Sequence, residues 1–188
     1  MRDVGRSCQA LGVTRVAFPP QETVVILGTS RDDGNTWATV QAVLGRKPVE
    51  VVNLSDAQFT TYDYRHRNED DGFLPLVEAI VGKSFWIFAT PVYWYSMSAQ
   101  LKAFFDRLSD LITIRKDLGR RLRGKSVAVV ASGTDEAIPD GFEVPFQRTC
   151  EYLGMRYMGT FYLSYGKDDR ASSSHLEAAR KVGAAWIS

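Results

Sequence analysis

The chain has 188 residues, of which 45% are hydrophobic, and its 23 basic and 22 acidic residues leave a formal net charge of +1. That length predicts one domain whose core can fold without disulfides, and the balanced charge gives no reason to expect nucleic acid or an anionic membrane as a partner. The two cysteines, Cys8 and Cys150, are too few and too far apart for a disulfide scaffold, a four-cysteine zinc site or a cysteine-ligated iron–sulfur cluster.

Residues 1–22 differ from the rest of the chain and predict an N-terminal arm, partly disordered, that precedes a domain at 23–188. They carry three arginines and the pair Pro19-Pro20, which neither a helix interior nor a central strand tolerates. They lack the basic-then-apolar order of a signal peptide, and no apolar run in the chain approaches the roughly 18 residues of a membrane span. We therefore expect a cytoplasmic protein.

The first half of the chain alternates between apolar runs that suit strands and stripes that suit helices. Trp37, Val40 and Leu44, for example, recur at the i, i+3, i+7 spacing of a helix face. A polar stretch at 55–72 separates the second strand from the second helix. In chain order, the predicted elements are a strand at 23–28, a helix that contains Trp37 to Leu44, a strand at 49–53 and a helix at 73–81.

The second half repeats the alternation with stronger signals. The run at 84–90 is almost wholly apolar, as expected of a strand covered on both faces, and the stripe from Leu101 to Ile112 is the strongest helical signal. Cys150 falls on the apolar side of a later helix, which predicts a small buried side chain. The predicted elements are a strand at 84–90, a helix through 101–112, a strand at 126–131, a helix through 142–153, a strand at 156–164 and a final helix that begins at the capping-box spacing Ser174-His-Leu-Glu177.

Five strands that are each followed by a helix predict an α/β fold, a three-layer sandwich in which helices cover both faces of an open parallel sheet. Five strands are too few for a closed eight-stranded barrel. Open sheets of this kind bind ligands at the carboxyl ends of their strands, where the strand order reverses. The loops after the first, third and fourth strands are therefore where we expect the chemistry.

The first of these loops, Gly28-Thr-Ser-Arg-Asp-Asp-Gly-Asn-Thr36, leads from a buried strand to a helix N-terminus, where unpaired amides and the helix dipole suit a phosphate. Ser30 and Thr36 offer hydroxyls, and Arg31 offers a cation. The loop is not a nucleotide-triphosphate loop, since no Gly-Lys-Ser/Thr follows, and it lacks the Gly-x-Gly-x-x-Gly of a dinucleotide fingerprint. A plain turn with Asn35 as the helix cap is the alternative.

The second loop, Thr90-Pro-Val-Tyr-Trp-Tyr-Ser-Met-Ser98, places three consecutive aromatic residues outside the sheet. Exposed aromatic side chains at the carboxyl end of a strand indicate a flat ligand that stacks there, and a hydrophobic lid or a subunit contact is the alternative. The third loop, Ser132-Gly-Thr-Asp135, presents small polar groups and is a weak signal on its own.

Together the three loops resemble those of the NADPH-dependent FMN reductase family, which has the flavodoxin-like fold. The residues that carry the resemblance are Gly28–Thr36 and Thr90-Pro-Val-Tyr-Trp-Tyr-Ser-Met-Ser-Ala-Gln-Leu-Lys-Ala-Phe-Phe-Asp-Arg107, the second of which is close to the family's flavin-loop signature over its whole length. The resemblance spans about residues 23–187 and implies the strand order 2-1-3-4-5. The cysteine-rich segment with which some relatives ligate an iron–sulfur cluster is missing here.

The resemblance implies an enzyme that passes hydride from NADPH or NADH to bound FMN and then reduces a small-molecule acceptor such as a quinone, a flavin, an azo dye or a metal ion. The cofactor does the chemistry, so no side chain is expected to act as an acid, base or nucleophile. A homodimer or tetramer is expected as well, because the apolar stripe runs on to Ile114, further than one sheet face needs. The FMN-binding residues that the resemblance implies are Ser30, Arg31, Asn35, Thr36 and Trp37 in the first loop, Pro91, Val92, Tyr93, Trp94, Tyr95, Ser96 and Met97 in the second, and Ser132, Gly133, Thr134 and Asp135 in the third.

A non-catalytic flavodoxin that carries electrons between proteins is the closest alternative. Such carriers tend to be strongly acidic, whereas this chain is nearly neutral and has a basic cluster at 115–125. We expect that cluster to be solvated, although it could attract the phosphates of NADPH or an acidic partner. A phosphoacceptor signalling domain is not expected, because it would need an aspartate where Thr90-Pro91 stands. A hydrolase is not expected either, because no serine, histidine and acid fall on strand ends in a recognisable order.

Two histidines and an acidic run complete the predictions. His66 and His175 are expected at the surface, since neither has partners at metal-ligand spacing. Glu69-Asp70-Asp71 is expected to form a solvated helix start with Asp71 as its cap.

Overall fold

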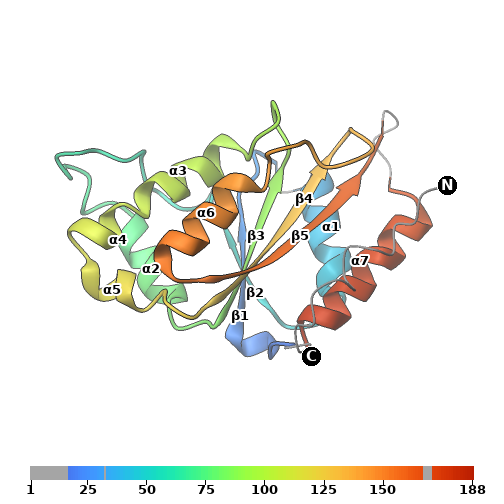
Figure 1. The fold of residues 1–188 in the computed structure, drawn as a ribbon, viewed down its shortest axis with the longest axis horizontal. Coiled ribbons are helices and arrows are strands. Elements are labelled where there is room, and N and C mark those ends of the chain that lie inside the picture. The colour runs from blue at the N-terminus through green and yellow to red at the C-terminus, as the bar shows by residue number, and fades with distance from the viewer. Residues whose placement is uncertain (1–16, 32, 167–170) are drawn as a thin grey trace.

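The computed structural model describes residues 17–31, 33–166 and 171–188, and Figure 1 shows how its elements are arranged. Strands and helices alternate as predicted. In chain order the elements are the 3-10 turn η1 (Pro20–Glu22), β1 (Thr23–Leu27), α1 (Asn35–Leu44), β2 (Glu50–Asn53), α2 (Phe73–Ile80), β3 (Phe85–Pro91), α3 (Ala99–Arg107), α4 (Asp110–Thr113), α5 (Lys116–Arg120), β4 (Ser126–Gly133), α6 (Val144–Leu153), β5 (Arg156–Ser164) and α7 (Ser173–Trp186). Within these described ranges, no helix has the length and apolar character that crossing a bilayer requires.

The strands form one parallel sheet in the order β2-β1-β3-β4-β5, which confirms the predicted flavodoxin-like architecture. Every residue of β1 and β3 is buried, in agreement with their continuous apolar runs, whereas the edge strands β2 and β5 are partly exposed. The winding of the chain reverses between β1 and β3. The carboxyl ends of these two strands therefore form the switch point at which such sheets bind ligands.

Helices cover both faces of the sheet. In Figure 1, α1 and α7 lie on one face, and α2, α3 and α6 lie on the other. Successive strand residues point to opposite faces, so Val24 and Trp86 belong to the apolar cluster under α2, α3 and α6, while Val25 and Phe85 belong to the cluster under α1 and α7. Cys150 is 3% exposed in the first cluster, which confirms its predicted burial.

The chain is packed against the sheet from Phe18 onward. The Phe18 ring stacks on the Phe85 ring with their centroids 4.4 Å apart, and the Phe18 amide donates to the Trp186 carbonyl at 2.8 Å. Phe18, which the prediction assigned to the N-terminal arm, is therefore packed against the domain. Residues 1–16, with Cys8, lie outside the described residues.

The predicted helix through 101–112 is wrong in its extent, because the chain divides there into α3 and α4. After α3 the backbone turns, and this turn brings the Asp110 carboxylate back to Arg107, whose Nε donates to it at 2.6 Å. Leu108 and Leu111 remain buried on either side of the break. The apolar spacing therefore continues through the turn, and for this reason it does not reveal where the helix ends.

The final helix also begins earlier than predicted. Its N-cap is Ser172, whose Oγ accepts a hydrogen bond from the His175 amide at 3.2 Å. Ser174 lies inside α7, and its hydroxyl pairs with that of Ser172 at 2.8 Å, so the predicted cap at Ser174 is wrong. His175 is exposed, as predicted.

A buried ion cluster fastens the polar stretch 55–72 to α3. Arg107 is 0% exposed, and its guanidinium donates to Asp71 and Asp110 at 2.6 Å each and to two carbonyls of the stretch. Its Cζ lies 4.8 Å from the centre of the Phe73 ring. The expectation of a solvated acidic run is therefore wrong for Asp71, because its carboxylate pairs with the buried guanidinium of Arg107. The N-cap of α2 is Gly72, so the prediction of Asp71 as the cap is wrong. Asp71 lies one residue before it, and its Oδ1 accepts a hydrogen bond from the Phe73 amide at 3.0 Å.

His66 belongs to the same cluster, so its predicted surface position is wrong. Its side chain is 20% exposed, and its Nδ1 lies 3.0 Å from the Asp110 carboxylate. The left-handed backbone at His66, with φ of 52°, turns the ring toward α4. The partner is distant along the chain, and the local sequence contains no sign of it.

The basic cluster is mostly solvated, as predicted. Lys116, Arg120, Arg121 and Arg123 are exposed. Lys125 differs, because its ammonium is buried and donates to the Lys83 carbonyl, and burial lowers the pKa of Lys125. These residues precede β4 and thus lie at the amino edge of the sheet, away from the carboxyl ends where a ligand is expected.

Candidate functional site

A cavity of about 330 Å³ opens at the carboxyl edge of the sheet, at the predicted switch point. All three predicted loops contribute to it. It is lined by Thr29, Arg31, Gly34, Asn35 and Thr36 after β1, by Pro91, Val92 and Tyr93 at the end of β3, and by Ser132, Gly133 and Thr134 at the end of β4. Thr29 and Gly34 are additions to the predicted set.

The first loop presents a helix N-terminus to the cavity. α1 begins at Asn35 after Gly34, which has no capping side chain, so the alternative with Asn35 as the cap is wrong. A Cβ at Gly34 would lie 3.4 Å from the Arg31 guanidinium, which means that the exposed Arg31 side chain lies beside this glycine. The amides of the first helical turn, the helix dipole and a cation thus meet at one place, which suits an anion.

A buried hydrogen bond joins the first loop to the third. The hydroxyls of Thr36 and Ser132 are 2.7 Å apart, and both residues are 3% exposed. A second link lies behind them, where the Tyr165 hydroxyl donates to the Asn35 carbonyl at 2.9 Å. The base of the cavity is therefore held rigid by bonds between residues that are far apart in the sequence.

The second loop is anchored on both sides. The Val92 amide donates to the Ser132 carbonyl at 2.7 Å, and the Ser98 hydroxyl donates to the Gly28 carbonyl at 2.7 Å while also capping α3. A Cβ at Gly28 would lie 2.6 Å from the Leu101 Cβ. Only glycine therefore allows α3 to approach the end of β1 this closely, and that approach fixes the position of the second loop.

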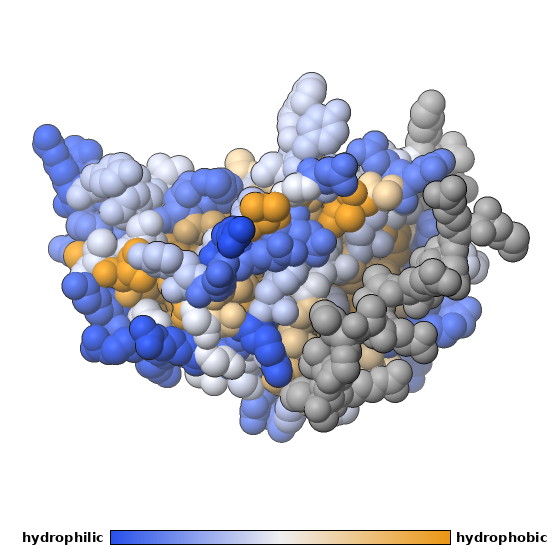
Figure 2. Space-filling model, viewed as in Figure 1, coloured by the Kyte–Doolittle hydropathy of each residue, from blue (hydrophilic) through white to orange (hydrophobic). Residues whose placement is uncertain are grey.

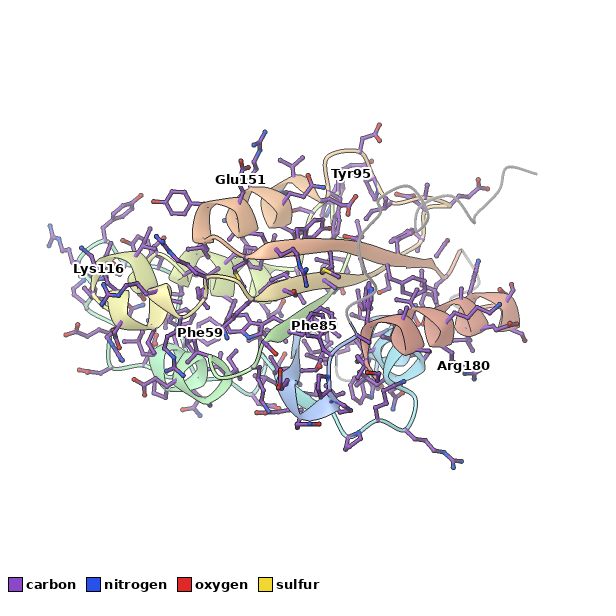
Figure 3. The ribbon with its side chains drawn as sticks, turned by 60° about the horizontal axis from the view of Figure 1, so that its bottom comes forward. Phe59, Phe85, Tyr95, Lys116, Glu151 and Arg180 are labelled. Atoms are coloured by element: carbon purple, nitrogen blue, oxygen red, sulfur yellow. The ribbon has the colours of Figure 1, made fainter. Side chains whose placement is uncertain are left out.

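The three aromatic residues of the second loop separate into two groups. Tyr93 is 49% exposed and lines the cavity, whereas Trp94 is 93% exposed and Tyr95 is 67% exposed, and neither lines it. Figure 2 shows this turn as a pale lobe that projects from the top of the molecule, and Figure 3 places Tyr95 far from the buried Phe85. The prediction that these aromatics lie outside the core is confirmed.

The remaining predicted residues lie around the cavity rather than in its lining. Met97 is 6% exposed in the core beneath the second loop, and Trp37 packs on the apolar cluster under α1 and α7. Ser30 accepts a hydrogen bond from Gln100 Nε2 at 2.9 Å. Ser96 and Asp135 are exposed, and the Asp135 carbonyl accepts from the Tyr162 hydroxyl.

Tyr162 on β5 holds the third loop in place. Its hydroxyl donates to the Asp135 carbonyl at 2.9 Å, and a Cβ at Gly133 would lie 2.6 Å from the same hydroxyl. Burial and the nearby Asp135 carboxylate raise the pKa of Tyr162, so the phenol remains a donor. Tyr162 was not among the predicted site residues, because nothing in the sequence of an edge strand indicates which tyrosine faces the loop of the neighbouring strand.

The residues that line the cavity define its chemistry. They include the cation Arg31, several hydroxyls and the Tyr93 ring, and none of the lining residues within 17–31, 33–166 and 171–188 is an aspartate or a glutamate. Such a lining favours an anionic group together with a flat aromatic one. It contains no paired nucleophile and base with which side chains could carry out catalysis on their own.

Comparison with known proteins agrees with this description. The family model for NADPH-dependent FMN reductase matches residues 22–184. A relative in Bacillus subtilis (strain 168), named as the NAD(P)H-dependent FMN-containing oxidoreductase YwqN, is 30% identical over 150 residues, which cover 72% of this chain and 80% of the relative.

Solved structures show the same fold. The Trp repressor binding protein from Bacillus subtilis superposes with a TM-score of 0.68 at 25% identity and covers 85% of this chain and 96% of its own. The flavodoxin of Megasphaera elsdenii superposes with a TM-score of 0.52 at 18% identity over 86% of this chain and 98% of its own. Because the family model covers nearly all of the domain and includes each loop that lines the cavity, this chain belongs to the NADPH-dependent FMN reductase family.

Proposed function

We propose that this chain is an FMN-dependent oxidoreductase that takes electrons from NADPH or NADH and gives them to a small-molecule acceptor. The observation that carries the proposal is the lining of the cavity at the switch point. It combines a helix N-terminus and Arg31 with the Tyr93 ring, and no carboxylate is among the lining residues that the structure describes. A ligand with an anionic phosphate and a flat ring system, as FMN has, fits that combination.

The FMN phosphate would lie at the N-terminus of α1. First-turn amides have no acceptor within their own helix, and the helix dipole favours negative charge there. Arg31 lies beside Gly34 and would add a charge-assisted hydrogen bond. Gly34 leaves the approach free of a side chain, and the hydrogen bond between Thr36 and Ser132 would keep the base of the site rigid as the ligand binds.

The ring system of FMN would lie against the wall formed by Pro91, Val92 and Tyr93 and beside Gly133. The bond between the Val92 amide and the Ser132 carbonyl fixes this wall. Bound FMN would supply two-electron chemistry: it would take a hydride from the reduced nicotinamide and pass on two electrons and one proton, with any second proton coming from the solvent. The residues of the chain bind and orient the reactants, and none needs to donate or remove a proton.

We also propose that the protein is a homo-oligomer, a dimer or a pair of dimers. An apolar groove of about 280 Å³ lies between α3–α4 and α6 and includes Phe105, Leu108 and Ile112. Tyr152, which is 75% exposed, also lines this groove, and Val144 at the start of α6 is 50% exposed. Apolar side chains around one groove favour a protein interface, and a second copy is the partner that the family suggests. Sedimentation at micromolar concentration tests this: a single species near 21 kDa would contradict it.

Anaerobic reduction tests the proposed function. The protein loaded with FMN is mixed with NADPH or NADH in the absence of oxygen, and the loss of the oxidised flavin absorbance is followed in a stopped-flow instrument. We expect at least one nucleotide to reduce the flavin at a rate compatible with turnover. A protein that binds FMN but is reduced by neither nucleotide would contradict the proposal and favour a flavodoxin-type electron carrier.

A further inference from the structure

The turn at the tip of the second loop has an unusual backbone. The Tyr93 amide donates to the Ser96 carbonyl at 2.9 Å, and the Ser96 amide donates to the Tyr93 carbonyl at 3.0 Å, which closes a two-residue turn. The two central residues, Trp94 and Tyr95, have φ of 48° and 65°. Glycine, asparagine and aspartate are the residues that favour such a turn, because a side chain with a bulky Cβ substituent is strained at positive φ. Two consecutive aromatic residues are therefore unfavourable for the fold at this position.

The exposure of the two rings is unfavourable as well. Trp94 is 93% exposed and Tyr95 is 67% exposed, and Figure 2 shows the turn as a lobe that stands clear of the surface. The base of the turn does not give the rings freedom to fold back, because Met97 is buried and the Ser98 amide is bonded to the Thr90 hydroxyl at 2.9 Å. Neither folding nor packing in this chain explains the aromatic tip, and residues that are strained and exposed together indicate a binding role.

The position of the turn shows which ligand the tip can reach. The turn begins at Tyr93, which lines the cavity, so the tip stands next to the cavity and outside its lining. Residues 92–99 carry no charged side chain. An uncharged aromatic surface beside the site has no group that would attract the phosphates of a nicotinamide nucleotide or the charge of a metal complex, but it can stack on a neutral conjugated ring.

We propose that Trp94 and Tyr95 form a stacking platform that selects neutral, flat, conjugated electron acceptors of the quinone class, an inference that rests on the function proposed above. NAD(P)H supplies a hydride and the solvent a proton, so the quinone gains two electrons and two protons and leaves as the hydroquinone. Trp94 determines the specificity of this step by binding the acceptor, and it takes no part in the transfer itself.

The decisive variant is Trp94→Gly, which removes the ring and replaces a strained residue with one that favours positive φ. Binding of menadione, a neutral naphthoquinone, to the oxidised FMN-loaded protein is measured calorimetrically without any nicotinamide nucleotide. We expect the dissociation constant to rise about tenfold, the loss that corresponds to one aromatic stacking contact. The melting temperature of the variant should equal or exceed that of the wild type, because the strain is gone.

Steady-state kinetics add a second readout. Menadione is compared with ferricyanide, a charged complex that cannot stack, two equivalents of which take the same two electrons. The ratio of kcat/KM for menadione to that for ferricyanide should fall about tenfold in Trp94→Gly and return toward the wild-type value in Trp94→Phe. The control Tyr64→Ala removes a ring that is 88% exposed but does not line the cavity, and it should leave the ratio unchanged.

Each outcome decides the proposal. Unchanged menadione binding and an unchanged ratio in Trp94→Gly would overturn the platform while leaving the proposed function intact. Equal losses for both acceptors, together with dissociation of an oligomer in sedimentation, would also overturn it and assign the tip to a subunit contact. A wild-type protein that fails to bind FMN, or that neither nucleotide reduces, would instead refute the proposed function itself.

Discussion

Replacing Arg107 with methionine should strongly destabilise the protein. The guanidinium is 0% exposed and donates to Asp110 and Asp71 at 2.6 Å each. Methionine can fill much of the space of the side chain but carries no charge. The Arg107→Met variant would therefore leave the Asp110 carboxylate, whose side chain is 2% exposed, and the Asp71 carboxylate, whose side chain is 16% exposed, without their cation.

The size of the effect follows from the burial of the cluster. Removing one partner of a buried ion pair costs about 3–5 kcal/mol, a large part of the roughly 5–15 kcal/mol by which domains are stable. For a chain of this length, that loss lowers the melting temperature by about 6–20 °C. Lys102→Met is the matched control on the same helix, because its pair with Asp106 has side chains that are 56% and 44% exposed. Such an exposed pair contributes less than about 1 kcal/mol.

The same variant changes the dependence of stability on pH. Burial acts to raise the pKa of Asp71, but the Arg107 guanidinium and the amides of Thr60 and Phe73 outweigh it and hold that pKa below its ordinary value. The depressed pKa stabilises the wild type above the unfolded value near 3.9, and this contribution is lost as the pH falls through the folded value. The difference between wild type and variant should therefore shrink below about pH 4.

Urea unfolding followed by circular dichroism measures both effects. It is carried out near neutral pH and in acid on the wild type, Arg107→Met and Lys102→Met with the same flavin content. The triple variant that adds Asp71→Asn and Asp110→Asn should recover part of the loss, because no buried charge is then left unpaired. An Arg107→Met protein within about 1 kcal/mol of the wild type at neutral pH would show that the buried ion cluster contributes little to the stability of the fold.

Three further predictions follow from other parts of the structure. Gly133→Ala places a Cβ 2.6 Å from the Tyr162 hydroxyl and should raise the dissociation constant for FMN about tenfold in a fluorescence titration, whereas Gly82→Ala, with open space around it, should not. Burial raises the pKa of the Cys150 thiol to about 12, so iodoacetamide should not label it at mildly alkaline pH until the protein is unfolded. Peptide mass spectrometry measures the labelling, and rapid labelling of the native protein would contradict the burial of Cys150. Tyr152→Glu should shift sedimentation toward the 21.0 kDa monomer if the groove beside α6 is the interface, and an unchanged oligomer would place the interface elsewhere.

The sequence pattern predicts the layout of this fold well, because burial and periodicity are local properties. Fully buried strands such as β1 and β3 appear as short apolar runs, and the alternation of strands with helices leaves a parallel sheet as the solution. The positions of the three site loops follow directly from that alternation. The strand order required the family resemblance, since periodicity does not determine which strands are neighbours.

The rest depends on contacts between distant residues. The hydroxyls of Thr36, at the start of α1, and Ser132, at the end of β4, form a hydrogen bond although they are 96 residues apart. The charge of Arg107 on α3 is neutralised in part by Asp71, which precedes α2. No local pattern distinguishes Asp71 from its solvated neighbours in the same acidic run. The left-handed backbone at Trp94 was equally hidden, because the residue types there are ones that disfavour such a turn.

The proposed function depends most directly on FMN lying in the cavity with its phosphate at the N-terminus of α1. A substitution of Arg31 tests this better than a substitution of Thr36. Arg31 is exposed, whereas a charge introduced at Thr36 would be buried and could destabilise the fold. Arg31→Glu reverses the charge beside Gly34, and Arg46→Glu makes the same change at an exposed position near the opposite end of the helix.

The measurement is a titration of the flavin-free protein with FMN and with riboflavin, followed by the quenching of flavin fluorescence. We predict that FMN binds far more tightly than riboflavin, which lacks the phosphate. Its dissociation constant should rise about tenfold to a hundredfold in Arg31→Glu, from the loss of a charge-assisted hydrogen bond worth about 1.5–3 kcal/mol, and should stay unchanged in Arg46→Glu. Equal binding of FMN and riboflavin by the wild type would contradict a phosphate site at the N-terminus of α1. The absence of quenching by either flavin would contradict flavin binding altogether.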